Sequence, residues 1–240
     1  AIGYGLNNGL QALIARRAGE NRTEEIGYIF TQGVLIGIIM AAAGIIITYT
    51  ITPYIFSLIL HDPVVHKKAV EFLQIRIWGL PFLYVFQLRN ALLVGTNQSR
   101  YLVAGTLAET TTNVGLDYLL IFGMAGFPEL GFNGAAIASV IAEFVGMFVI
   151  FLVIRWKGIS KRFNLFRRLK WSKENNALIF SMSAPLMFQH AISIISWQFF
   201  FLLTEHHGDM ALKVSNVMRN IFGVFGCVTW AFAASANAMV

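Results

Sequence analysis

The sequence predicts an all-α protein whose helices cross a lipid bilayer several times. Of the 240 residues, 57% are hydrophobic and only 12% are charged, whereas about 25% of the residues in a soluble domain carry a charge. Apolar runs of about 20 residues recur along the chain, and this is the length that an α-helix needs to cross the hydrocarbon core. Hydrocarbon offers the backbone no hydrogen-bond partners, so each such run is predicted to be a helix.

Five complete membrane-spanning helices are expected, and two further apolar runs reach the ends of the sequence. Because these two runs are cut off inside an apolar stretch, we expect the chain to be a piece of a longer protein. Pro81 and Pro185 lie inside complete spans, where a proline is expected to kink the helix. The complete spans are expected at 27–50, 72–95, 101–124, 131–154 and 177–203, and the partial spans at 1–14 and 215–240.

The basic residues alternate between the expected loops in a way that predicts the orientation of the helices. Twelve Lys and Arg residues lie in three alternate loops, whereas the intervening loops hold three. Loops rich in Lys and Arg stay in the cytoplasm, so these basic loops are predicted to be cytoplasmic. Eight of the twelve lie within 155–173 beside aromatic residues, which is typical of a segment that rests on anionic lipid rather than one that binds nucleic acid.

Three acidic residues, Glu109, Asp117 and Glu143, lie within the expected spans. An ionised carboxylate in hydrocarbon is costly, so each should be paired, protonated or turned toward water. Counted along the helices, Arg89 lies at a similar depth to Glu109, and the two are expected to form a structural ion pair. Arg76 is a less comfortable partner for Asp117, and Glu143 lies near the midplane with no cation expected at its depth.

Asn113 and Asp117 are four residues apart and therefore share one face of a helix. Oxygen ligands that converge on one carboxylate suit a hard cation such as Na⁺, and the same carboxylate could instead carry a proton. Hydrogen bonding between packed helices explains the pattern equally well. The residues alone leave a coupling site and a packing interface open.

Stretches along nearly the whole chain carry a recognisable pattern. TTTNVGLDYLLIFG and GFPELGFNGAAIAS form its most specific pair, and HDPVVHKKAVEFLQIRIWGLPF, ARRAGE and SAPLMF accompany them. Together they resemble the multidrug and toxic compound extrusion (MATE) family, from the end of its second helix through most of its eighth. The resemblance implies a fold of two six-helix lobes. Residues 1–154 would form most of the N-terminal lobe without its first helix, 155–176 a basic cytoplasmic inter-lobe loop, and 177–240 the start of the C-terminal lobe.

The resemblance also implies a secondary active transporter rather than an enzyme. Such an antiporter would export amphipathic, often cationic, drugs or metabolites across a prokaryotic cytoplasmic membrane in exchange for Na⁺ or H⁺. The lipid bilayer and a small-molecule substrate would be its partners, with no nucleic acid and no cofactor besides the coupling ion. The full-length protein would be a monomer.

The resemblance assigns the coupling site to the first lobe. Asn113 and Asp117 match an Asn and Asp pair that binds the coupling ion on the fifth helix of many prokaryotic members, so Na⁺ would bind there. Ser139 stands where those members carry a Thr on the sixth helix. Glu143 is added to the coupling set because no cation is expected at its depth.

Five residues are candidates for a substrate cavity, because polar and aromatic groups on apolar walls are typical of a binding pocket. Two of them stand where other members carry acidic residues on the seventh helix, so the resemblance does not support coupling through the second lobe. These two are Ser193 and Gln198, and the other three candidates are Asn90, Gln189 and Trp197.

Two other functions remain open from the sequence. A lipid-linked oligosaccharide flippase shares the family's overall fold, but such proteins often line their cavity with cations, and few cations lie in these spans. A non-transporting membrane scaffold would leave the three acidic residues inside the membrane unexplained.

Overall fold

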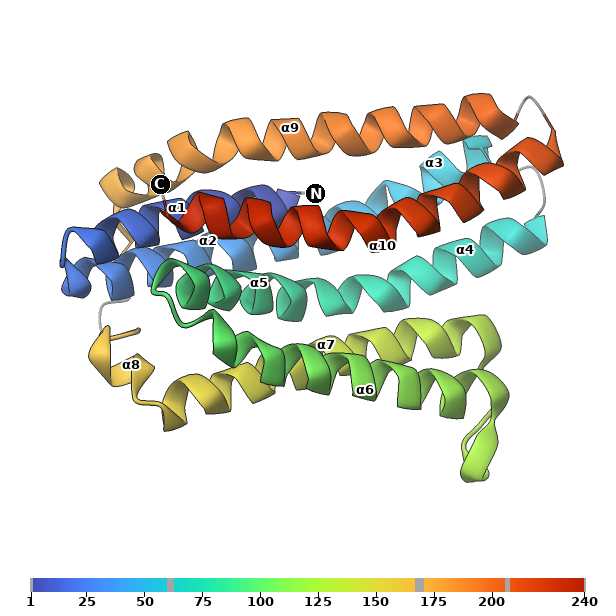
Figure 1. The fold of residues 1–240 in the computed structure, drawn as a ribbon. Coiled ribbons are helices and arrows are strands. Elements are labelled where there is room, and N and C mark those ends of the chain that lie inside the picture. Colours follow the sequence, from blue (N-terminus) through green and yellow to red (C-terminus); the bar gives the residue numbers. More distant parts are fainter. Residues whose placement is uncertain (1, 60–62, 167–170, 206–207, 240) are drawn as a thin grey trace.

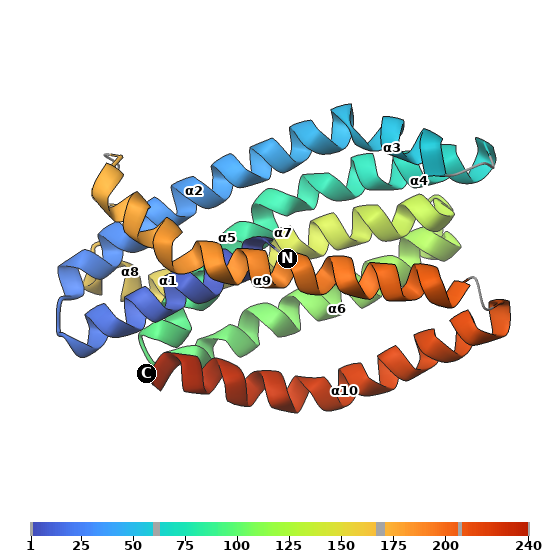
Figure 2. The same cartoon turned by 90° about the horizontal axis from the view of Figure 1, so that it is seen from above.

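The chain folds into long helices that run roughly parallel or antiparallel to one another (Figures 1 and 2). The computed structural model describes residues 2–59, 63–166, 171–205 and 208–239, and no strand occurs in these ranges. The elements are α1 (Ile2–Gly19), α2 (Thr23–Thr50), α3 (Thr52–Ile59), α4 (Pro63–Arg76), η1 (Ile77–Gly79), α5 (Leu80–Gly95), η2 (Ser99–Tyr101), α6 (Leu102–Phe122), η3 (Met124–Gly126), α7 (Gly131–Trp156), α8 (Ile159–Arg162), α9 (Lys173–Glu205) and α10 (Asp209–Met239).

The prediction of an all-α membrane protein is confirmed. Within the described residues, four helical segments are long and apolar enough to cross a bilayer, and they coincide with four of the five expected complete spans. The fifth expected span forms α6, which carries Glu109, Asp117 and several threonines and is therefore less apolar. The four segments are Thr23–Thr50, Pro63–Gly95, Gly131–Trp156 and Lys173–Phe201.

The segment between the first two spans is helical, and α4 begins at Pro63, where the Asp-Pro pair of the sequence predicts a helix start. α3 continues beyond α2, and α4, η1 and α5 follow one another without an interruption. The tight turn η1 falls directly before Pro81, which has no N–H to donate to the carbonyl of Ile77, one helical turn earlier. That carbonyl instead accepts from the N–H of Leu80, a shorter-range bond typical of a 3₁₀ turn.

Two groups of helices form the molecule. α1 packs against α9, α5 and α2, and buried residues of these helices make up most of the hydrophobic core. α6 and α7 run side by side as an antiparallel pair, and α7 connects this pair to α4 and α5 (Figures 1 and 2). The arrangement places the face of α7 that carries Ser139 and Glu143 against polar residues of α6 and α4.

The expected inter-lobe loop at 155–176 is fixed to the start of α2. Phe163 is buried, the backbone N–H of Phe166 donates to the Thr31 hydroxyl, and the N–H of Ser172 donates to Gln32 Oε1. Trp156 is 83% exposed at the same end of the molecule, as expected for an aromatic residue at a membrane interface. Residues 167–170, four positions of this basic loop, lie outside the described residues.

An ion-pair network connects the end of α1 with the start of α2 at this basic end of the bundle. Arg17 Nη1 lies 2.7 Å from Glu20 Oε2, and Arg16 Nε lies 3.0 Å from Glu20 Oε1. Arg17 Nε lies 3.1 Å from Oε2 of Glu25, which belongs to the first turn of α2. Hydrogen bonds from Arg17, Arg16 and Arg22 lower the pKa of Glu20 from 4.5 to about 2. A lowered pKa means that this stabilisation is present above about pH 4.5 and is lost as the pH falls toward 2.

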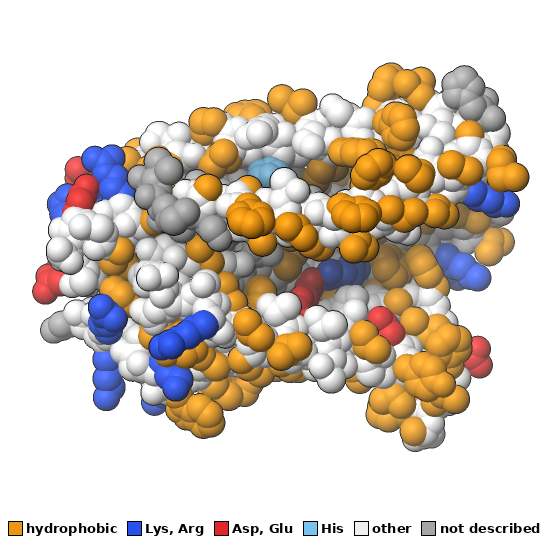
Figure 3. Space-filling view, viewed as in Figure 1, with side chains coloured by type: hydrophobic (Ala, Val, Ile, Leu, Met, Phe, Trp, Pro, Cys, Tyr) orange, Lys and Arg blue, Asp and Glu red, His pale blue; other side chains and the backbone are white. Residues whose placement is uncertain are grey.

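Large apolar side chains cover much of the surface (Figure 3). In a soluble protein exposed apolar patches of this extent are uncommon, but they suit helices whose solvent is lipid. Acidic and basic side chains are visible in the recess between α10 and the α6–α7 pair (Figure 3). The inner face of the bundle thus carries charges while its outer surface is apolar.

Candidate functional site

An ion pair inside the bundle joins the end of α4 to the middle of α7. Arg76 Nη1 donates to Glu143 Oε2 at 3.0 Å, and Arg76 Nη2 donates to Glu143 Oε1 at 2.5 Å. The Glu143 side chain is 6% exposed and that of Arg76 is 32% exposed. Two parallel hydrogen bonds between a guanidinium and a carboxylate form a strong and oriented contact. The expectation that Glu143 has no cation at its depth is therefore wrong.

Gly79 makes room for this pair. A Cβ at position 79 would meet Glu143 Oε2, and it would lie 2.6 Å from Arg76 Nη1. Neither this glycine nor the pairing was expected from the sequence. A signal was available, because Gly79 lies two residues before Pro81, at the end of the turn η1, and a glycine there allows the backbone to approach another helix closely.

The expected ion pair between Arg89 and Glu109 is not formed. Arg89 Nη1 instead donates to the backbone carbonyl of Met147 at 2.5 Å, and its guanidinium lies 5.4 Å from the centroid of the Phe151 ring. Glu109 of α6 lies against Gly146 of α7, close enough to Glu143 and Arg76 to interact with both charges. Equal depth does not mean adjacency, because each side chain also has a direction around its helix axis.

Asn113 and Ser139 meet across the α6–α7 interface. Asn113 Nδ2 donates to Ser139 Oγ at 3.3 Å. Asp117 lies one helical turn from Asn113 on the same face of α6. Its Oδ1 atom is buried and has no hydrogen-bond partner among the described residues, and the suggested pairing with Arg76 is excluded because Arg76 binds Glu143.

The chemistry of this cluster fits a small hard cation or a proton. A buried carboxylate oxygen without a donor is costly to maintain, and a bound cation or proton would satisfy it. Asn113 uses its amide nitrogen toward Ser139, which leaves the amide oxygen as a ligand. Oxygen ligands of these kinds are those that hard cations prefer.

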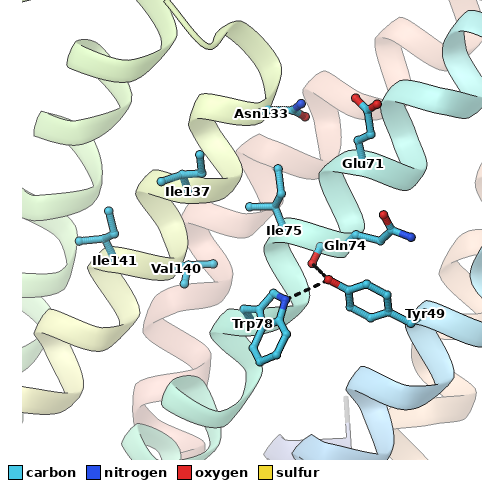
Figure 4. Close-up of a pocket in the computed structure, with 9 residues that line it drawn as sticks. All are labelled: Tyr49, Glu71, Gln74, Ile75, Trp78, Asn133, Ile137, Val140 and Ile141. Carbon is cyan, nitrogen blue, oxygen red and sulfur yellow. Dashed lines mark hydrogen bonds between the residues drawn. The ribbon is translucent and has the colours of Figure 1, made fainter. Parts of the chain in front are cut away.

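The five expected substrate-cavity residues are not enclosed. Gln189, Ser193, Trp197 and Gln198 of α9 are exposed, and Asn90 of α5 is half-buried. A cavity of about 460 Å³ lies elsewhere, between α2, α4 and α7 (Figure 4). The residues that line it include none of the five, and this groove was not expected from the sequence.

Within the described residues, no group of three or more His, Cys, Asp or Glu side chains could hold a metal ion. The candidate site contains one carboxylate, that of Asp117, and the neutral side-chain oxygens of Asn113 and Ser139. The fold and the charges within its spans define the protein as a polytopic membrane protein whose polar groups lie between packed helices.

Comparisons with known proteins agree with this class. A family model described as MatE matches residues 1–119. The probable multidrug resistance protein NorM of Bacillus anthracis is 31% identical over 158 residues, which are 65% of this chain and 35% of that protein. The probable multidrug resistance protein YoeA of Bacillus subtilis is 26% identical over 223 residues, which are 90% of this chain and 47% of that protein.

The fold is also that of a solved transporter. A MOP superfamily transporter from Pyrococcus furiosus superposes with a TM-score of 0.80 over 99% of this chain and 51% of that chain, at 20% sequence identity. The chain belongs to the MATE family. It spans about a third to a half of the length of the curated relatives it matches.

Proposed function

We propose that this chain is part of a cation-coupled antiporter that exports amphipathic compounds, and that Asp117 carries the coupling ion. The relatives NorM and YoeA are named as probable multidrug resistance proteins, which supports drug export as the activity of the whole transporter. The chain would supply the coupling site and part of the substrate path. The protein would act as a secondary transporter in the cytoplasmic membrane, and not as an enzyme.

The observation that carries the proposal is the orphaned oxygen of Asp117 beside the Asn113–Ser139 contact. Burial without a donor is costly for a carboxylate unless something binds it in part of the transport cycle. Na⁺ would take Asp117 and Asn113 oxygens as ligands, with the Ser139 hydroxyl as a third, and H⁺ would neutralise Asp117 directly. Both ions would favour a closer approach of α6 and α7.

Glu143 is not included in the proposed coupling site. Its carboxylate is occupied by the Arg76 guanidinium, and a paired carboxylate has less affinity for a proton or cation than a free one. The pair is proposed to hold α4 against α7. The helix α7, which the coupling residues of α6 face, would then stay in a fixed position.

The flippase alternative is less well supported. A cavity for a pyrophosphate-linked substrate requires cations that are free to bind phosphate oxygens. Arg76 binds Glu143, and Arg89 is directed at the Met147 carbonyl and the Phe151 ring. These two arginines are therefore engaged within the protein.

The decisive experiment measures efflux of a cationic dye by the full-length transporter in proteoliposomes. An imposed Na⁺ or H⁺ gradient should drive efflux by the wild-type protein. Asp117→Asn removes the charge but preserves the shape, so the variant should bind the dye and lose the response to the gradient. Dye binding by fluorescence separates this loss of coupling from a loss of folding.

Glu129→Gln is the matched control. Glu129 is an exposed carboxylate at the turn between α6 and α7, outside the proposed site, so this variant loses the same charge but should respond to the gradient like the wild type. Gradient-driven efflux by Asp117→Asn at the wild-type rate would refute the assignment of Asp117.

A further inference from the structure

The groove between α2, α4 and α7 is separate from the coupling site. Its volume is about 460 Å³, which lies within the range of small-molecule pockets. On α7 it is lined by residues such as Ile137 and Ile141, whereas the coupling site uses Ser139. Residues two positions apart on a helix face different directions, so the two sites lie on different sides of α7.

One wall of the groove is a stripe of residues along α4 and the start of the next turn. Glu71, Gln74 and Trp78 follow one another at helical spacing and line the same side. Figure 4 shows Glu71 near Asn133 at one end of the groove and Trp78 near Tyr49 at the other. The groove is therefore polar at one end and continues along apolar side chains of α7.

Hydrogen bonds fix the aromatic end. Trp78 Nε1 donates to the Tyr49 hydroxyl at 3.0 Å, and this hydroxyl donates to the backbone carbonyl of Gln74 at 3.1 Å (Figure 4). Trp78 is 54% exposed and Tyr49 is 42% exposed. Half-exposed tryptophan and tyrosine rings are typical of protein surfaces at the boundary between lipid and water.

Both signs of charge are present at or beside the polar end. Glu71 lines the groove, and Lys67 lies one turn earlier on α4, outside the lining residues, with Lys67 Nζ 4.0 Å from Glu71 Oε1. The two side chains are 79% and 44% exposed, and an exposed ion pair of this kind contributes little, so a ligand that carries both charges can replace it. An anionic headgroup would meet Glu71 and a purely cationic amphipath would meet Lys67, whereas a zwitterion satisfies both.

We propose that this groove binds one phospholipid with a zwitterionic headgroup that bears an ammonium group. The ammonium would bind Glu71, the phosphate would bind Lys67, and the Gln74 amide would donate to an ester carbonyl. One acyl chain would lie along Ile137 and Ile141. This end of α4 is opposite the basic loops, so the lipid would come from the outer leaflet in the orientation that we propose.

The test is native mass spectrometry of the purified full-length transporter in detergent, with phosphatidylethanolamine, phosphatidylcholine and phosphatidylglycerol of matched acyl chains. Phosphatidylethanolamine should bind most tightly, because its ammonium can donate hydrogen bonds to a carboxylate and that of phosphatidylcholine cannot. Glu71→Gln should weaken phosphatidylethanolamine binding by about tenfold, since one charge-assisted hydrogen bond is lost. The affinity of the Glu71→Gln variant for phosphatidylglycerol should not fall.

Two further variants make the result specific to the groove. Ile137→Trp fills the apolar part and should weaken all three lipids, whereas Glu129→Gln removes an exposed carboxylate elsewhere and should bind them like the wild type. Equal retention of the three lipids by the wild type would mean annular lipid only and would overturn the proposal. Unchanged lipid preference in Glu71→Gln, or displacement of the lipid by a cationic dye with higher affinity, would also overturn it.

Discussion

At the scale of single residues, the partner of each charge inside the membrane depends on its direction as well as its depth. Counted along the helices, Arg89 and Glu109 lie at a similar depth in the membrane, but they do not pair. Arg89 donates to the Met147 carbonyl instead, and the ion pair that does form joins Arg76 to Glu143. Removing one member of a buried ion pair leaves the other charge without compensation. Arg76 and Glu143 are therefore a unit, and its geometry depends on the space that Gly79 leaves.

Gly79→Ala is predicted to destabilise the protein by about 1–3 kcal/mol, because the new methyl group would overlap Glu143 Oε2 and approach Arg76 Nη1. In other helical positions the same change is neutral or favourable, because alanine has the higher helix propensity. Thermal unfolding in detergent measures the effect. Gly115→Ala in α6 is the control, since no other atom lies within 4 Å of the added methyl group, and an equal unfolding temperature for the two variants would contradict the prediction.

At the scale of elements, the α6–α7 pair determines whether the coupling residues meet. The two helices approach so closely that a Cβ at Gly134 would lie 2.7 Å from the backbone oxygen of Leu120. Contacts between small residues and backbone are a common way to pack helices in membranes. This close approach brings Asn113 within 3.3 Å of Ser139, which neither helix could achieve alone.

Gly134→Ala is predicted to separate α6 from α7 where Gly134 contacts the backbone of Leu120, and thereby to weaken coupling. Backbone atoms cannot rotate out of the way, so the helices must shift, at a cost of about 1–3 kcal/mol. The measurement combines the unfolding temperature with gradient-driven dye efflux by the full-length transporter. Gly223→Ala in α10, where no other atom lies within 4 Å of the added methyl group, should leave both unchanged. Wild-type efflux by Gly134→Ala would show that this contact is not required.

At the scale of the whole molecule, the chain has an apolar outer surface and two ends that differ in charge. The basic residues gather where α1 meets α2 and around α8, whereas Lys67 and Lys68 lie at the other end. The imbalance predicts that the basic end faces the cytoplasm. This orientation also decides which leaflet supplies the lipid proposed for the groove.

Cysteine labelling in whole cells tests the orientation. In a full-length transporter without other cysteines, which includes Cys227→Ser, Ser57→Cys in α3 should react with a membrane-impermeant maleimide from outside. Ser99→Cys in η2 should react only after the cells are made permeable. Both serines are exposed in the structure, so lack of access would reflect the membrane. The reverse pattern would invert the proposed orientation.

Much of the fold could be predicted from the sequence because hydrophobic length and backbone hydrogen bonding are local properties. Four of the expected spans meet the length and apolarity that a membrane crossing requires, and the fifth forms α6 as a helix. The helix α3 was not expected, because it lies between the apolar runs that are long enough to be spans, whereas α4 begins at Pro63 as the Asp-Pro pair predicts. The contact between Asn113 and Ser139 agrees with the family resemblance, whereas the Arg76–Glu143 pair and the groove between α2, α4 and α7 were not foreseen.

The number of apolar segments, the positions of the charges along them and the charge asymmetry between the two ends can all be derived from the amino-acid sequence. These follow from composition and from the fixed rise of a helix. The packing of the helices was needed to establish which charges pair, that Asp117 Oδ1 is buried without a donor, and that Glu71 and Trp78 line a groove with α7. The physical reason is that contacts between helices depend on how each helix is rotated and how closely its small residues allow another backbone to approach.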